Sequence, residues 1–318
     1  MAFDVGQIIY NSITDTSHPV VVFVHGWTFK MANAWAANNN PLWDQLEAAK
    51  FRAAFVNLDP NGSIQTNAQS LTDQLKQITT KYGVKKVVAV CHSKGGLDIQ
   101  GAIYYNNADA FLEYVITFCT PHWGSALADL IYYIDSLRTP GISDLVKKQT
   151  VPATYDLQMS QMIDFRKMFD TNDRCAAVKF YTFAGSGTEE SNVNKFDKNI
   201  MNYFGPNDDF VNIKCALKLG ATHVATLPYY HDEMIMGDRI WDTLLLCLSN
   251  KCPSEQIVPN TYIVTINPFQ IGSAILYSAI NTYGLLYWKY ISATLVLLLT
   301  ILEHYNKYFM AQLCCYFS

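Results

Sequence analysis

The chain has 318 residues, 50% of them hydrophobic, and a formal net charge of −4 at neutral pH. It is long enough for one large α/β domain or two smaller ones, each with a sizeable core. The mild charge and the lack of a dense lysine and arginine cluster exclude an electrostatic basis for nucleic-acid binding, so no nucleic-acid partner is expected.

Short apolar runs rich in β-branched residues alternate along the chain with segments of helical periodicity. Strands are predicted at residues 20–24, 53–58, 87–90, 114–118 and 178–183, and helices at 41–50, 67–82 and 235–248. This alternation implies a mostly parallel sheet with helices on both faces. In such sheets the functional site lies beyond the carboxyl ends of the strands, so the loops after them should meet.

The most informative segment follows the third predicted strand and reads Cys91-His92-Ser93-Lys94-Gly95-Gly96-Leu97. A strand, one sharp turn and a helix form the context of the nucleophile elbow, whose motif is G-x-S-x-G. Small residues are needed around the serine because backbone and helix approach closely there. Gly95 and Gly96 meet that need, and Cys91 stands where the motif usually has glycine. Ser93 is therefore the candidate nucleophile, with an ordinary turn and a chance serine as the alternative.

A serine nucleophile needs a base and an acid that orients the base. In α/β-hydrolases the acid and then the histidine follow the serine along the chain. The acids after the predicted strand at 178–183 are Asp208 and Asp209, and the later histidines are His223 and His231. His231 lies just before the last predicted helix, which favours it as the base.

Stabilising the oxyanion requires two hydrogen-bond donors near the serine. The backbone N–H of Lys94 follows the nucleophile and is the first expected donor. The second should come from the turn after the first predicted strand, His25-Gly26-Trp27, where the N–H of Trp27 is preferred. The alternative is a plain turn in which His25 makes a structural hydrogen bond.

Together these segments resemble the bacterial triacylglycerol lipases of the α/β-hydrolase superfamily, over most of residues 18–245. The resemblance implies the α/β-hydrolase fold, with Ser93 as nucleophile, Asp208 as acid and His231 as base. The family's acid precedes a glycine, whereas Asp209 follows here, so Asp209 stays an alternative acid. The matching segments, in the family's order, are residues 19–26, Asn67-Ala68 with Leu71, 91–98, 120–129, Asn207-Asp208 and His231-Asp232-Glu233.

Further features are implied only by this resemblance. Such lipases often have a disulfide at the places that Cys175 and Cys215 occupy here, with two buried thiols as the alternative. The family also holds a structural Ca²⁺ near the catalytic histidine, for which Asp232 and Asp197 are the candidate ligands. The chemistry itself requires no cofactor.

Residues 125–165 are predicted to form an insertion with two helical stretches, at 127–137 and 142–148. Its apolar and polar residues are arranged as in an amphipathic lid that opens at a lipid–water interface. A packed helical hairpin without motion is the alternative.

The density of charged residues falls sharply after residue 250, where only Lys251, Glu255, Lys289, Glu303 and Lys307 are charged. We therefore predict a hydrolase domain at 1–250 and an apolar tail at 251–318. Residues 283–302 are long and apolar enough to span a bilayer and to provide a membrane contact. A helix packed on the catalytic domain, or a segment without a native role, are the alternatives.

The start of the chain lacks the basic and apolar regions of a signal peptide, although the resemblance implies a secreted or cell-envelope protein. The function expected from the sequence is hydrolysis of lipid esters through an acyl-enzyme on Ser93. The alternatives are a short-chain carboxylesterase, a polyester depolymerase or a non-catalytic, membrane-associated lipid-binding module.

Overall fold

The computed structural model describes residues 4–27, 40–136, 149–187, 201–249, 252 and 256–257. In this part of the chain eight strands form one sheet, in the order β1-β3-β2-β4-β5-β6-β7-β8. Only the edge strands β1 and β8 run antiparallel to their neighbours. The strands are β1 (Ile8–Tyr10), β2 (Val21–Val24), β3 (Ala53–Val56), β4 (Val87–His92), β5 (Leu112–Phe118), β6 (Lys179–Gly185), β7 (Thr222–Leu227) and β8 (Gln256–Ile257).

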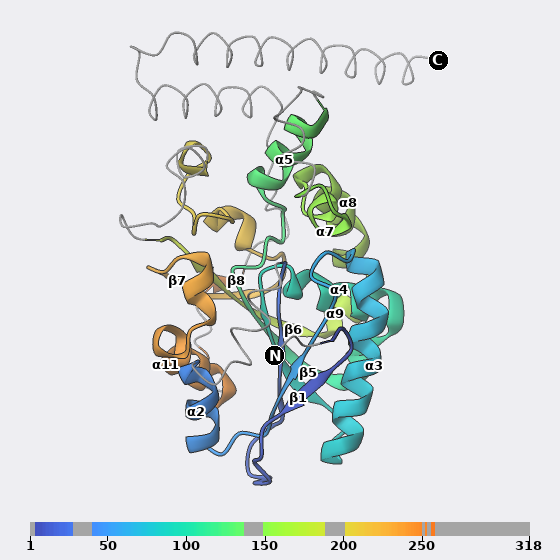
Figure 1. Ribbon diagram of the computed structural model, residues 1–318, viewed down its shortest axis with the longest axis vertical. Coiled ribbons are helices and arrows are strands. Elements are labelled where there is room, and N and C mark those ends of the chain that lie inside the picture. The colour runs from blue at the N-terminus through green and yellow to red at the C-terminus, as the bar shows by residue number, and fades with distance from the viewer. Residues whose placement is uncertain are drawn as a thin grey trace.

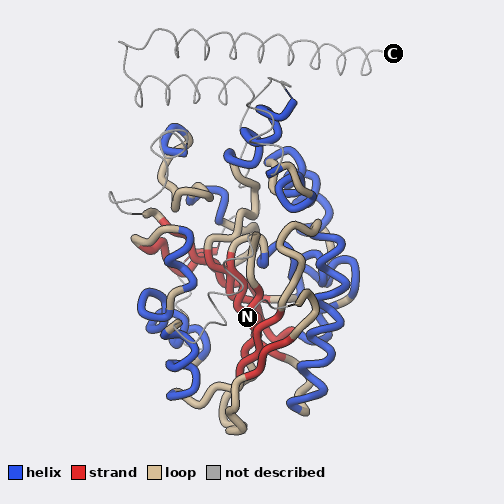
Figure 2. Tube along the Cα trace, in the orientation of Figure 1, coloured by secondary structure: helices blue, strands red, loops and turns tan. Residues whose placement is uncertain are grey.

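Helices cover both faces of the sheet, as expected for an α/β-hydrolase fold. Figure 1 shows α2 and α11 on one side and α3, α4 and α9 on the other, and Figure 2 shows the strands between them. The longer helices are α2 (Pro41–Ala48), α3 (Ile64–Tyr82), α4 (Gly95–Asn106), α5 (Ala126–Ser136), α8 (Met159–Asp170) and α11 (Gly237–Leu248). Shorter helical turns are η1 (Ala108–Phe111), α7 (Pro152–Asp156), α9 (Asp173–Ala177), η3 (Ile213–Ala216) and η4 (His231–Ile235).

The fully buried strand β2 supplies both hydrophobic cores, because successive side chains of a strand point to opposite faces. Val22 and Val24 belong to the core under α3 and α4, with Leu71. Val21 and Phe23 belong to the core under α2 and α11. A continuous apolar run at residues 20–24 is the sequence pattern that such a two-sided burial requires.

Most predicted elements are present, with shifted ends. Helix α3 begins at Ile64 rather than at residue 67, because the Ser63 hydroxyl accepts a hydrogen bond from the Thr66 amide and caps the helix. Gly83 ends it in the left-handed conformation, at φ 64°. Strands β1, β7 and β8 were not predicted.

The interval expected to form a lid contains α5, α7 and the first part of α8. Figure 1 places these helices together beyond one end of the sheet. The expected helical stretch at 142–148 lies outside the described residues. The structure supports a helical insertion at this place, and the opening of a lid remains a prediction.

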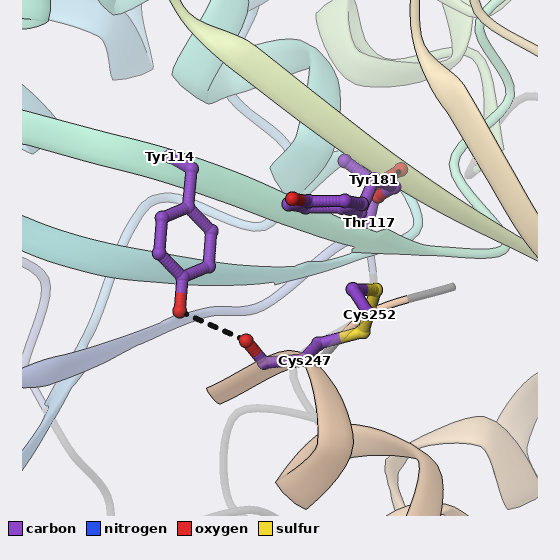
Figure 3. Close-up of a disulfide and its surroundings, with 5 residues drawn as sticks. All are labelled: Tyr114, Thr117, Tyr181, Cys247 and Cys252. Carbon is purple, nitrogen blue, oxygen red and sulfur yellow. Dashed lines mark hydrogen bonds between the residues drawn. A yellow bond between two sulfur atoms is a disulfide. The ribbon is translucent and has the colours of Figure 1, made fainter. Parts of the chain in front are cut away.

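The predicted disulfide between Cys175 and Cys215 is absent, and both residues are buried free thiols. They belong to different hydrophobic clusters, Cys175 to the core under α3 and α4 and Cys215 to a smaller cluster with Trp123. A disulfide instead joins Cys247, near the end of α11, to Cys252. Figure 3 shows it beside Tyr114, whose hydroxyl donates a 3.0 Å hydrogen bond to the Cys247 carbonyl.

Among the described residues, no helix has the length and hydropathy needed to cross a membrane. The predicted span at 283–302 lies outside the described residues. Of the predicted tail at 251–318, the structure describes only residues 252, 256 and 257, so the domain boundary expected after residue 250 stays a prediction.

Candidate active site

Ser93 lies in the turn between β4 and α4, with the strained backbone of a nucleophile elbow. Its φ angle is 52°, in the left-handed region that a non-glycine residue adopts only at a cost. The Ser93 amide donates a 2.9 Å hydrogen bond to the Phe118 carbonyl, and the Ser93 carbonyl accepts one of 3.1 Å from Gly96. Both ends of the residue are thus tied to neighbouring elements, which sustains the strain.

Three glycines allow the elements around Ser93 to approach one another. A Cβ atom on Gly26 would lie 2.5 Å from Ser93 Cβ, and one on Gly95 would lie 2.5 Å from the His25 carbonyl oxygen. A Cβ atom on Gly96 would collide with the Thr120 side chain. The small residues of the predicted motif are therefore required by close packing and not only by the turn.

The structure brings His231 and Asp208 together. His231 Nδ1 lies 2.8 Å from Asp208 Oδ2, and the His231 amide donates a 2.9 Å hydrogen bond to the Asp208 carbonyl. Burial of the ring disfavours its charged form, but the charge of Asp208 and the hydrogen bond to it outweigh this cost and raise the pKa of His231. His231 can therefore accept a proton and hold it against a buried carboxylate.

Asp208 is fully buried and held in one orientation by the turn that it begins. Its Oδ1 atom accepts hydrogen bonds from the amides of Phe210, at 3.0 Å, and Val211, at 2.7 Å. These bonds leave Oδ2 for the imidazole. The two amide bonds also keep the carboxylate from rotating away from the imidazole.

Asp209 occupies the left-handed position of the same turn, at φ 82°. This conformation favours glycine, and aspartate is among the few other residues that adopt it readily. The Asp209 amide donates a 2.8 Å hydrogen bond to Asn207 Oδ1. Asp209 thus takes the place of the glycine that follows the acid in the resembling lipases, and Asp208 is the carboxylate that meets the histidine.

Of the other histidines His92 and His223, only His92 contacts the His231–Asp208 pair. His92 Nε2 lies 2.9 Å from the His231 carbonyl, and the two rings lie 4.6 Å apart. Burial, followed by the proximity of His231, lowers the pKa of His92 well below its ordinary value, so the neutral ring donates to that carbonyl. His223, the alternative base, lies in β7 between Thr182 and Thr226. His92 and not His223 therefore supports the site.

The turn that carries Trp27 packs against the turn that carries Ser93 and Lys94. A Cβ atom on Gly26 would lie 3.0 Å from the Lys94 nitrogen, so the turn carrying Trp27 runs directly past the elbow. His25 Nδ1 bonds the Gly26 carbonyl at 2.8 Å, and the Leu58 amide donates to His25 Nε2 at 2.9 Å. The structural hydrogen bond predicted for His25 is thus present. It fixes the peptide unit between Gly26 and Trp27, which contains the Trp27 N–H.

A cavity of about 240 Å³ opens at Ser93 and His231. Most of its wall is apolar and comes from α5, from Leu157 after α7 and from the turn after Asp208. Trp27 and Asp232 complete the wall beside the histidine. The remaining lining residues are Pro121, Ser125, Leu127, Ala128, Ile131, Thr154, Leu157, Phe210 and Val211.

The described residues do not assemble a calcium site around Asp232. Asp197, the second expected ligand, lies outside them, and Asp232 lines the cavity instead. The one described cluster that combines thiol, carboxylate and imidazole groups is Cys119, Asp208 and His231. It includes the histidine–acid pair itself and offers a single carboxylate, whereas calcium prefers about six to eight oxygen ligands. Calcium binding therefore stays a prediction from the resemblance.

Comparison with solved structures shows the same fold in enzymes that cleave esters. The mature form of Bacillus licheniformis lipase BlEst2 is 32% identical, with a TM-score of 0.69, over 77% of this chain and 99% of that one. Its propeptide form is 30% identical, with a TM-score of 0.71, over 82% of this chain and 56% of that one. A metagenomic carboxyl esterase shares the fold at 14% identity, with a TM-score of 0.53, over 74% of this chain and 77% of that one. No protein-family model matches the sequence, and no curated protein sequence does.

Proposed function

Because this chain belongs to a lipase family of the α/β-hydrolase superfamily, we propose that it hydrolyses lipid esters through an acyl-enzyme on Ser93. Ester hydrolysis is the activity class of the lipases and esterases that share its fold. One observation carries the proposal: a strained serine and a histidine–carboxylate pair meet at one largely apolar cavity. This arrangement supplies each group that acyl transfer needs.

In the proposed reaction the Ser93 hydroxyl attacks the ester carbonyl while His231 takes its proton. Asp208 holds the ring through Nδ1 and stabilises the positive charge that forms. The N–H groups of Lys94 and Trp27 stabilise the oxyanion of the tetrahedral intermediate. His231 then protonates the leaving alcohol and activates the water that releases the acid.

The apolar cavity wall favours an acyl chain as the bound group. Leu127, Ala128 and Ile131 of α5 and Leu157 after α7 offer it a hydrophobic surface. We propose that α5 covers this surface and moves when the protein meets a lipid–water interface. A rise in activity once a triglyceride forms an emulsion would support that motion, and activity that follows dissolved substrate alone would oppose it.

A short-chain carboxylesterase is the second candidate, favoured by the size of the cavity. Its volume of about 240 Å³ lies below the range of about 300–1,000 Å³ typical of ligand pockets. A long acyl chain would therefore need the wall formed by α5 to yield. The two candidates share the catalytic groups and differ only in the length of acyl chain that they accept.

The test is hydrolysis of nitrophenyl esters from acetate to palmitate by the full-length chain and its Ser93→Ala variant. A lipase should turn over long chains as well as short ones, and the variant should lose activity by about 10⁴-fold or more. Activity limited to short chains would favour the carboxylesterase. A folded protein inactive on every ester would refute both and favour the non-catalytic lipid-binding module.

A further inference from the structure

The residue after the nucleophile carries a buried positive charge. The Lys94 side chain is 1% exposed, and its Nζ atom lies 2.6 Å from Oδ1 of Asp98, one turn further along α4. Lysine is almost never buried in this way unless it is paired. We propose that the Lys94 ammonium group is the positioning group of the oxyanion hole and holds both oxyanion donors in place, an inference that rests on the proposed serine hydrolase function.

The first donor is the amide of Lys94 itself. The Lys94 carbonyl accepts hydrogen bonds from the amides of Leu97, at 2.8 Å, and Asp98, at 2.9 Å. The Lys94 side chain returns to the same turn of α4 and ends at the Asp98 carboxylate. With its carbonyl and its side chain both fixed, Lys94 keeps its amide on the side of the turn that faces Gly26. A Cβ atom added to Gly26 would lie 3.0 Å from the Lys94 nitrogen.

The second donor, the Trp27 amide, depends on Lys94 through His25. Because a peptide unit is planar, the hydrogen bond from His25 Nδ1 to the Gly26 carbonyl also fixes the direction of the Trp27 N–H. The Leu58 amide donates to His25 Nε2, which requires a neutral ring with its proton on Nδ1. His25 packs against the first residue of α4, since a Cβ atom on Gly95 would lie 2.5 Å from the His25 carbonyl oxygen. Burial lowers the pKa of His25, and the nearby positive charge of Lys94 acts in the same direction. Lys94 thus helps to keep the one form of His25 that orients the second donor.

Residues of α3 and α7 surround the ion pair and interact with it. Asp98 Oδ2 accepts a 3.1 Å hydrogen bond from the Asn67 side chain, which also bonds the Asp59 carbonyl at 3.0 Å. Asp156, at the end of α7, is a second acid whose charge interacts with both Lys94 and Asp98. It accepts a 2.6 Å hydrogen bond from the Ile64 amide at the start of α3. The network therefore connects the elbow to α7, whose neighbouring residues line the cavity.

Stability alone does not account for this pair. Burying two charges costs so much desolvation that apolar residues of similar size often stabilise a protein equally well or better. Removing one partner alone, by contrast, leaves an unpaired buried charge and is strongly destabilising. We therefore expect a double replacement of Lys94 and Asp98 by apolar residues to preserve folding while it removes the positioning charge.

The test compares the full-length wild type with the double variant Lys94→Met/Asp98→Leu and with Lys86→Met, which removes an exposed lysine as a matched control. Titration with a fluorophosphonate first counts reactive serines. The kcat and KM for nitrophenyl butyrate are then measured per reactive serine, together with the Ki of a trifluoromethyl ketone, whose serine adduct carries an oxyanion.

We expect the double variant to keep its KM within about twofold of the wild-type value. Its kcat should fall and its Ki should rise by the same factor, about tenfold or more, which is smaller than the loss caused by removing one oxyanion donor entirely. Lys86→Met should match the wild type. A double variant with altered melting temperature but unchanged kcat and Ki per reactive serine would overturn the positioning role. A wild type without any reactive serine would overturn the proposed function, and this inference with it.

Discussion

Replacing Asp208 by asparagine changes one atom of the candidate triad and preserves its size. In the wild type, Oδ1 accepts two backbone amides and Oδ2 faces His231 Nδ1. The new side chain has one acceptor oxygen, which the amides of Phe210 and Val211 will hold. Its NH₂ group then points at the imidazole and forces the ring proton onto Nε2, where the ring cannot accept the proton of Ser93.

The expected loss follows from that change of tautomer. A wrong tautomer with intact geometry costs about 10⁴-fold in kcat, or about 5 kcal/mol of transition-state stabilisation. Asp209→Asn is the matched control, because asparagine also tolerates the left-handed conformation at this position. We expect its kcat to stay within about threefold of the wild type, since such a change is worth less than 1 kcal/mol.

The pH dependence provides a second measure of the same contact. Below its raised pKa His231 is protonated and cannot act as a base, so kcat/KM of the wild type should fall as the pH drops through a value above the ordinary histidine pKa of about 6.5. In Asp208→Asn burial remains without the compensating charge, so this limb should move to lower pH. Steady-state kinetics with nitrophenyl butyrate between pH 5 and pH 9 would measure both effects. A large loss in Asp209→Asn with little change in Asp208→Asn would refute the assignment of the acid.

Three further predictions concern the oxyanion turn, the α5 helix and calcium. Gly26→Ala should lower kcat by about 100-fold or more, because its Cβ atom would collide with Ser93 and displace the turn. Steady-state kinetics should show the lower kcat with an unchanged KM, and a wild-type kcat would refute the prediction. Burial raises the pKa of Asp129 in α5 to about 7, so the folded chain binds an extra proton between about pH 4 and 7 and loses stability as the pH rises through that range. Asp129→Asn should therefore raise the melting temperature more at pH 8 than at pH 5, and an equal shift at both would contradict the cause. Calcium should raise the melting temperature and a chelator should reverse it, in the wild type but not in Asp232→Ala; a wild type indifferent to the chelator would dismiss calcium binding.

The sequence predicts the centre of the fold well because its signals are local. Continuous apolar runs identify the buried parallel strands, and the glycines after Ser93 identify the elbow, because close packing admits no larger residue there. The edge strands β1 and β8 were missed because they are only three and two residues long. Strand β7 was missed because it is mostly half-buried and lacks an apolar run.

The unpredicted parts of the site depend on tertiary contacts or on backbone conformation. The choice between Asp208 and Asp209 rests on the contact of Asp208 with His231 and on the positive φ angle at Asp209. Two adjacent aspartates in a sequence reveal neither. The Lys94–Asp98 spacing is typical of a solvated helical ion pair, and only the packing of α3 and α4 shows that it is buried. The predicted Cys175–Cys215 disulfide was wrong because the two cysteines are buried in different hydrophobic clusters, which a resemblance in sequence position does not reveal.

The most direct test of the account is to locate the covalent adduct that a fluorophosphonate forms with the full-length chain, by peptide mass spectrometry. We predict a single modified peptide with the adduct on Ser93, formed much more slowly in Asp208→Asn and absent in Ser93→Ala. A folded chain that forms no adduct, or forms it on another residue and keeps its esterase activity in Ser93→Ala, would contradict the assignment of Ser93 as the nucleophile.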